Sequence, residues 1–340
     1  MKKTLALLLS LVLALGAAGA FAQPEIKGDL TLYSTMTDND INNLLDLIAE
    51  EYPDLTVDVV NGSAGELTAR LRAESANPIA DVMWGGLNNG DGQTHADLFE
   101  HWLTQYEDQI YPDYRSNNGF YSFDHLSTIV FCVNKQLEAD LGLEIKGYQD
   151  LLNPALKGKI VMPDPNSSSS AWNNLCNMLA VFGYDSDATW DYVRAFLGNG
   201  VVISTSSSVA FKSVDAGEYV VGLTYEDGAA TLTKAGSDRT RMVYPEEGAS
   251  AFAFGVAVVK NAKNMDNAKA VAELLMSPEG QSRLGNALGT LRFTNMLADY
   301  QSPYLPDTDE ITWVTRDMEW LVANKQMVLD KWNAIYTALN

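Results

Sequence analysis

The sequence predicts an α/β protein made of two similar units, and three observations lead to this prediction. Short apolar strands alternate with segments of helical spacing, which indicates parallel sheets covered by helices on both faces. The alternation occurs twice along the chain. The two units are joined by apolar strands and not by a polar linker. A chain of 340 residues has ample length for two such units with sizeable cores.

The first unit has the order strand, helix, strand, helix, strand, at residues 30–33, 40–51, 55–60, 65–75 and 82–84. In its first helix Ile41, Leu44 and Ile48 recur at the spacing of one helical face. Parallel strands need such helical crossovers, so the order predicts a parallel sheet.

The second unit begins near residue 127. Strands are expected at 159–162, 201–204 and 219–224, and helices at 170–182, 188–198 and 209–216. The extended run 252–259 follows, and then more helices up to the C-terminus. Because 127–133 and 252–259 are apolar, we expect them to be the strands that join the units.

The N-terminus is typical of a secretory signal peptide. Lys2 and Lys3 precede an apolar run from about residue 5 to 18, and Ala20-Phe21-Ala22 gives a small-residue exit. The run is shorter than the about 20 apolar residues that span a bilayer. No Cys follows it, so a lipid anchor has no attachment residue. We expect a periplasmic protein, cleaved after Ala22.

Composition excludes several classes of partner. The formal net charge is −21. The field of such a charge repels nucleic acid and anionic membrane surfaces, so no nucleic-acid partner is expected.

The chain has two cysteines, and Cys132 lies in an apolar strand and Cys176 in an apolar helix. A disulfide and two buried thiols both fit this pattern.

The chain lacks the patterns of an enzyme. G-x-S-x-G, G-x-x-x-x-G-K-[ST] and H-E-x-x-H motifs are all absent from the sequence. His95 and His101 are six residues apart, which does not place them on one helical face. We therefore expect no catalytic residues, no cofactor and no metal site.

Three junctions between a strand and a helix are rich in hydroxyl groups, at 33–37, 167–170 and 204–208. One Ser or Thr is enough to cap a helix, and four consecutive serines exceed that need. Helix N-termini offer free backbone N–H groups to anions, and ligands of open α/β sheets bind at the carboxyl ends of strands. The junctions thus favour a phosphate or phosphonate group as ligand, with plain capping as the alternative.

A fourth junction, Tyr225-Glu226-Asp227, is acidic. Acidic residues are favourable at a helix start without any ligand. As ligand groups, Tyr225 would stack or donate, and a carboxylate would accept from a hydroxyl or an amine. This predicts an organic body on the anion. Trp84 is expected either beneath that body or in the core.

Seven segments, in this order and spacing, resemble the periplasmic solute-binding proteins of ABC transporters, in the branch that binds ferric iron, phosphonates or hexose phosphates. The segments are LYST at 32–35, DVMWGG at 81–86, LLNPALKGKI at 151–160, DPNSSSS at 164–170, GEYVVGLTYED at 217–227, YPEEG at 244–248 and SPEGQ at 277–281. The resemblance covers nearly the whole chain after the signal peptide.

The resemblance implies a two-lobed periplasmic binding protein fold of type II. Each lobe would be a mainly parallel sheet flanked by helices, and two crossing strands would form the hinge. Lobe 1 would comprise 23–130 and 253–340, and lobe 2 would comprise 131–252. The ligand would lie in the cleft, on which the lobes close like a Venus flytrap.

The implied function is that of the substrate-binding component of an ABC importer. The solute would be a small organic anion, most simply a sugar phosphate or an aminophosphonate. The partners would be permease subunits in the inner membrane, and a monomer is expected. Ferric iron is the alternative, but iron-binding members use a consecutive Tyr-Tyr pair where this chain has Tyr225-Glu226. The expected ligand-binding residues are Ser34, Thr35, Thr37, Trp84, Gly85, Ser167, Ser168, Ser169, Ser206, Ser207, Tyr225, Glu226 and Asp227.

Overall fold

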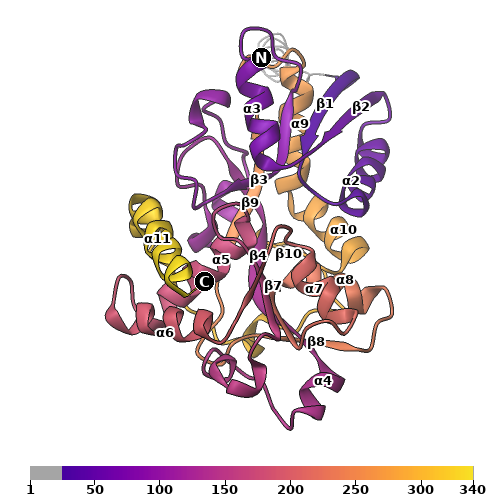
Figure 1. Cartoon of the computed structure of the whole chain (residues 1–340). Coiled ribbons are helices and arrows are strands. Elements are labelled where there is room, and N and C mark those ends of the chain that lie inside the picture. Colours follow the sequence, from indigo (N-terminus) through magenta and orange to yellow (C-terminus); the bar gives the residue numbers. More distant parts are fainter. Residues whose placement is uncertain (1–24, 340) are drawn as a thin grey trace, which may run out of the picture.

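The computed structural model describes residues 25–339, so the expected signal peptide lies outside the described residues. The molecule has two lobes, stacked one above the other in Figure 1, and strand β4 runs from one lobe into the other. This two-lobed α/β architecture confirms the predicted fold class.

Lobe 1 begins with the predicted order of elements. They are β1 (Gly28–Ser34), α2 (Asp38–Glu51), β2 (Leu55–Asn61), α3 (Ala64–Glu74) and β3 (Val82–Asn88). Strand β1 pairs in parallel with β2 and β3. Strand β3 extends four residues beyond the prediction, because Gly85 and Gly86 adopt φ values of 78° and 74° within it, which only glycine tolerates readily.

Lobe 2 also follows the predicted pattern. Its elements are α4 (Lys135–Asp140), β5 (Ile160–Pro163), α5 (Ser169–Phe182), α6 (Asp187–Gly198), β6 (Val202–Ser204), α7 (Val209–Asp215), β7 (Val221–Tyr225), α8 (Glu226–Lys234) and β8 (Thr240–Val243). Strand β5 pairs in parallel with β6 and β7. The sequence prediction did not include α4 or the short β8, which pairs with β4.

Two long strands cross between the lobes, as predicted. They are β4 (Ser122–Asn134) and β9 (Ala251–Val258), which pair antiparallel with Ser127 opposite Phe252. Strand β4 continues into lobe 2, where it pairs with β7. The strand order is β2-β1-β3-β9-β4-β7-β5-β6. The crossing strands are therefore the central members of one continuous sheet that joins the two lobes.

The chain after β9 continues in lobe 1 and then crosses to lobe 2 once more. Helices α9 (Met265–Met276) and α10 (Pro278–Leu288) pack with α2 on a common apolar cluster, and β10 (Arg292–Phe293) pairs with β4. The following segment runs beside the start of β9, where Ala249 N–H donates to Thr312 at 2.8 Å. Short 3₁₀ helices lie at Ala96–Leu98, Glu107–Gln109, Pro112–Tyr114, Gln149–Leu152, Pro154–Leu156 and Thr308–Glu310.

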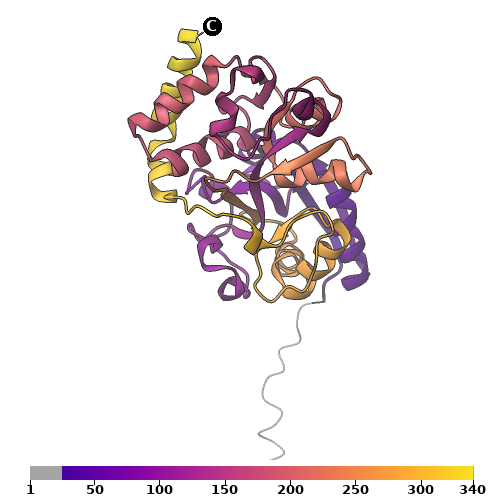
Figure 2. The same cartoon turned by 90° about the horizontal axis from the view of Figure 1, so that it is seen from below.

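The final helix α11 (Met318–Leu339) packs beside α6 of lobe 2, and both views show the two helices together (Figures 1 and 2). Its buried residues Leu321, Val328 and Trp332 belong to the apolar cluster of lobe 2. The lobe boundaries, with 23–130 and 253–340 in lobe 1 and 131–252 in lobe 2, stay a prediction. The apolar residues of α11, which the prediction places in lobe 1, pack on the core of 131–252.

Both cysteines, Cys132 and Cys176, are buried free thiols. Burial raises the pKa of each thiol to about 12, so they act as apolar core residues. No helix among residues 25–339 is long and apolar enough to cross a bilayer.

Candidate functional site

Two of the hydroxyl-rich junctions lie side by side. Strands β5 and β6 are parallel, with Pro163 opposite Ser204, so the segments that follow them leave the same edge of the sheet. Ser168 Oγ lies 2.8 Å from Ser207 Oγ and 3.0 Å from Ser170 Oγ. The structure thus brings together the serines of 167–170 and 206–208.

Ser168 is also the cap of helix α5. Its Oγ accepts the N–H of Ala171 at 3.3 Å. The first N–H groups of the helix have no acceptor within the helix and carry partial positive charge. Ser167 and Ser169 are exposed beside them, and Ser206 is exposed on the neighbouring turn. The result is a cluster of neutral donors suited to an anion.

The first junction, at the end of β1, is largely engaged by the protein itself. Ser34 is fully buried, and its Oγ donates to the Trp84 carbonyl at 3.1 Å. Thr35 N–H donates to the same carbonyl at 3.2 Å. Thr37 caps α2, and its Oγ1 donates to Asp40 at 2.7 Å. Among residues 25–339, no hydrogen bond joins this junction to Ser168 or Ser207.

Trp84 and Gly85 have structural positions. Trp84 is fully buried, and its indole N–H donates to Asp124 at 3.0 Å, so in this conformation it offers no surface to a ligand. Gly85 allows a close approach, because a Cβ there would lie 2.6 Å from Thr35 Oγ1. Trp84 therefore lies in the core, which was the alternative position expected from the sequence.

Tyr225 lies at the start of α8, at the carboxyl end of β7. It is partly exposed, and its ring packs edge-on against Phe211 at 5.8 Å. Burial and the nearby carboxylates of Asp227 and Asp40 raise the pKa of its phenol. The hydroxyl therefore stays protonated and can donate a hydrogen bond.

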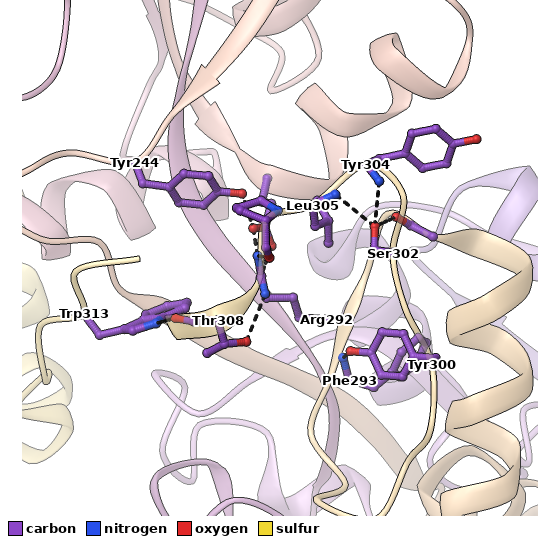
Figure 3. A network of polar contacts seen from close by, with 12 residues as sticks. Tyr244, Arg292, Phe293, Tyr300, Ser302, Tyr304, Leu305, Thr308 and Trp313 are labelled. Carbon is purple, nitrogen blue, oxygen red and sulfur yellow. Dashed lines mark hydrogen bonds and ion pairs between the residues drawn. The ribbon is translucent and has the colours of Figure 1, made fainter. Parts of the chain in front are cut away.

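Glu226 is buried and paired with other side chains of the protein. Its carboxylate accepts Arg292 Nε at 2.9 Å and the hydroxyl of Tyr244. The side chains of Glu226 and Arg292 are 2% and 10% exposed. Figure 3 shows Tyr244, Arg292 and Thr308 converging on this network. The pair ties α8 of lobe 2 to β10, which pairs with the lobe 1 part of β4.

Asp227 faces the other lobe. Burial, and next the charge of Asp40 in α2, raise the pKa of Asp227 to about 7, against the opposing effects of Thr290 and His125. Its Oδ1 is buried without a hydrogen-bond partner among the described residues. The charges of Asp227 in lobe 2 and Asp40 in lobe 1 therefore act on each other.

His125 of strand β4 lies beside these carboxylates. It is 5% exposed, and its Nδ1 is 3.0 Å from Asp124 Oδ2. Its ring stacks on Phe254 with centroids 6.0 Å apart. Burial lowers the pKa of His125, but Asp124 and two further carboxylates outweigh that effect and raise it.

Asp40, Asp124, His125 and Arg292 were not predicted as site residues from the sequence. Asp40 was visible as a helix-start residue, and Asp124-His125 interrupts an otherwise apolar strand. Both patterns are also those of structural residues. No local signal shows that Arg292 pairs with Glu226 or that Asp40 and His125 act on Asp227, because these residues are far apart in the chain.

Within residues 25–339, no group of three or more His, Cys, Asp or Glu side chains is placed to hold a metal ion.

Comparisons with known proteins place the chain in a family. The family model of the bacterial extracellular solute-binding proteins matches residues 43–308. The chain is 25% identical to iron uptake protein A1 of Synechocystis over 285 residues, 77% of this chain and 74% of that one. It is 26% identical to a putative 2-aminoethylphosphonate-binding periplasmic protein of Salmonella typhi over 238 residues, 68% of this chain and 67% of that one.

A solved structure agrees with the fold over most of the chain. The periplasmic binding protein AfuA of Actinobacillus pleuropneumoniae, with exogenous fructose-6-phosphate bound, superposes with a TM-score of 0.79 at 26% identity. The match covers 92% of this chain and 99% of AfuA. Fold, family model and relatives agree, and the chain belongs to the bacterial extracellular solute-binding proteins.

Proposed function

We propose that the protein is the substrate-binding component of an ABC importer and captures an organophosphate, such as a sugar phosphate or an aminophosphonate. The solute would bind in the cleft between the lobes, which close about the hinge strands. The protein would act as a periplasmic monomer and pass the solute to permease subunits in the inner membrane. The observation that carries the proposal is the meeting of Ser168 and Ser207 at the start of α5.

This serine cluster supports an anionic group on the ligand. Hydroxyls and helix N–H groups bind an anion without a positive side chain, since local donors decide the affinity. The net charge of −21 does not prevent this, because exposed charges are screened beyond about 8–10 Å.

The acidic side of the cleft supports an organic body. Asp227 and Asp40 come from different lobes, and Asp227 Oδ1 has no partner among the described residues. A hydroxyl or amine on the ligand would supply the missing donor, because buried polar groups are normally paired. Bare phosphate offers fewer such donors than a sugar phosphate or aminophosphonate.

Two relatives support the same solute class by their names. AfuA was solved with fructose-6-phosphate bound, and the Salmonella typhi relative is named for 2-aminoethylphosphonate. The relative named as an iron uptake protein keeps ferric iron as the alternative. Against iron, Tyr225 is followed by Glu226, and Glu226 is already paired with Arg292.

The first test is a thermal-shift comparison of the purified protein with fructose-6-phosphate, 2-aminoethylphosphonate, inorganic phosphate and ferric citrate. A ligand that binds only the folded state raises the melting temperature. We expect stabilisation by one of the organic anions. Stabilisation by ferric citrate alone would refute the proposed solute.

The second test replaces one serine of the cluster. Ser207→Leu should lower the affinity for the stabilising organic anion by about 10- to 100-fold, since a hydrogen bond to a charged group contributes about 1.5–3 kcal/mol. Thr205→Leu is the matched control, an exposed position in the same turn. Titration calorimetry measures both, and equal affinities would contradict the serine site.

A further inference from the structure

A cavity of about 600 Å³ lies beside the hinge, away from the proposed cleft. Consecutive strand residues point to opposite faces: His125 stacks on Phe254 on one face, while Leu126 lines the cavity on the other. Ser250 and Ala251 at the start of β9 also line it. None of the residues expected at the cleft is among its lining residues. The cavity is thus separate from the serine cluster and the acidic pair.

One lining residue, Arg316, has a donor without an acceptor. The residue is 9% exposed, its Nε donates to Ser250 Oγ at 2.7 Å, and its Nη2 donates to the Asn173 carbonyl at 3.1 Å. The guanidinium lies 4.4 Å over the Phe252 ring. Its Nη1 is buried with no hydrogen-bond partner among residues 25–339.

Arg316 also lacks a counter-charge. No ion pair within the described chain includes it. A buried charge is normally paired, because its removal from water is costly. Two of its three nitrogens are held by the protein, and Nη1 is the donor that remains without an acceptor among the described residues.

The second arginine of the cavity is already satisfied. Arg292 binds Glu226 through Nε, Thr308 Oγ1 through Nη1 at 3.1 Å and the Pro306 carbonyl through Nη2 at 2.8 Å (Figure 3). The carboxylate of Asp113 also lines the cavity but is exposed. An anionic group would therefore bind at Arg316, the cavity arginine that has no ion pair among the described residues.

The rest of the lining suits an apolar or aromatic body. Tyr111, Tyr114, Trp313 and Met318 all line the cavity, and the Trp313 indole N–H is already bonded to the Thr308 carbonyl at 2.9 Å. Small-molecule sites have this character, with volumes of about 300–1,000 Å³ and few polar groups. Of the two arginines that line the cavity, only Arg316 has no ion pair among the described residues. A ligand with a single negative charge would therefore match it.

We propose that this cavity is a second ligand site, which binds a small organic monocarboxylate with an aromatic or branched apolar body. The carboxylate pairs with Arg316, and the body packs on the tyrosines and Trp313. The site is independent of the proposed organophosphate site.

The test is titration calorimetry with 3-phenylpropionate as the probe, on the full-length mature protein. We expect saturable binding to the unaltered protein, at least tenfold weaker binding of the neutral analogue 3-phenylpropanol, and unchanged binding of the acid in the cleft variant Ser207→Leu.

Two variants address the cavity in different ways. Arg316→Met removes the cation at similar volume, and Ala298→Trp fills the cavity without altering Arg316, since Ala298 is a half-buried lining residue. Each should weaken 3-phenylpropionate binding at least tenfold. Arg194→Met, at an exposed arginine of α6, is the matched control and should bind as the unaltered protein does.

Folding is checked by circular dichroism. Arg316→Met should keep the spectrum of the folded protein, because removal of the desolvation cost of the buried charge offsets part of the lost hydrogen bonds to Ser250 and Asn173. No binding to the unaltered protein, equal binding in Ala298→Trp, or loss of binding in Ser207→Leu would each overturn the second site.

Discussion

At the residue scale, Glu226 and Asp227 show how surroundings assign different roles to adjacent carboxylates. Glu226 meets Arg292 and Tyr244 and forms a buried ion pair. Asp227, one residue later in the first turn of α8, is buried and lies in the field of the Asp40 charge. The carboxylate therefore forms an ion pair at the first position, whereas at the second one of its oxygens, Oδ1, has no hydrogen-bond partner among the described residues.

The raised pKa of Asp227 predicts a pH-dependent stability. The folded state holds the proton up to a pKa of about 7, whereas the unfolded chain releases it near the ordinary value of 3.8. The unfolded state thus binds fewer protons in this window, and the free energy of unfolding falls as pH rises, by up to about 1.4 kcal/mol per pH unit. Asp227→Asn should lack this loss. The free energy of unfolding of the variant, minus that of the unaltered protein, should therefore increase from about pH 4 to pH 7 and then level off.

Urea unfolding at several pH values between these limits measures the difference. Asp38→Asn is the control, because Asp38 is exposed in the first turn of α2 and should show no comparable trend. A difference between Asp227→Asn and the unaltered protein that does not change with pH would contradict the buried Asp227–Asp40 arrangement.

At the scale of elements, α11 shows that a helix can belong to a lobe to which it is not adjacent in sequence. Leu321, Val328 and Trp332 are spaced by seven and four residues and form one buried stripe. This stripe packs on the apolar cluster of lobe 2 beside α6. The helix closes that core and so contributes to its stability.

Trp332→Ala should lower the free energy of unfolding by about 3–5 kcal/mol, since Trp332 is 1% exposed and its removal leaves a cavity. Thr337→Ala, at an exposed position of the same helix, should change it by less than about 0.5 kcal/mol. Urea denaturation measures both. Similar small effects of the two substitutions would show that α11 does not pack as described.

At the scale of the whole molecule, the two lobes are connected on one side by more than the hinge strands. Besides the Glu226–Arg292 pair, Lys234 at the end of α8 donates to the Leu288 carbonyl of α10 at 2.7 Å. The segment before α11 crosses between the lobes as well, beside Ala249. Motion of the lobes would therefore pivot about the hinge strands β4 and β9 and would alter these contacts.

Such a pivot predicts a change of size on ligand binding. Small-angle scattering of the protein saturated with the organic anion that stabilises it should show a smaller radius of gyration than the free protein, because hinge closure brings the lobes together. The Ser207→Leu variant at the same ligand concentration should stay at the size of the free protein. An unchanged size of the saturated unaltered protein would argue against hinge closure.

The sequence by itself determined the elements and their joints. The periodicity of apolar residues predicted β1 to β3, α5 to α7 and the crossing strands 127–133 and 252–259, because burial patterns of strands and helices are local. The position of Ser168 and Ser207 at strand ends was equally visible, since parallel strands end at a common edge. Strand β8, strand β10 and α4 were missed because they are short.

Only the tertiary structure decided which polar residues meet. Glu226 with Arg292 and Asp227 with Asp40 are pairs far apart in the chain, and the positions of Trp84 in the core and of α11 on lobe 2 have the same origin. The cavity beside Arg316 forms from six segments that are separate in the chain. Local patterns set the burial of each element, but the charge and donors around a side chain depend on how distant elements pack, and that packing is not encoded within any single segment.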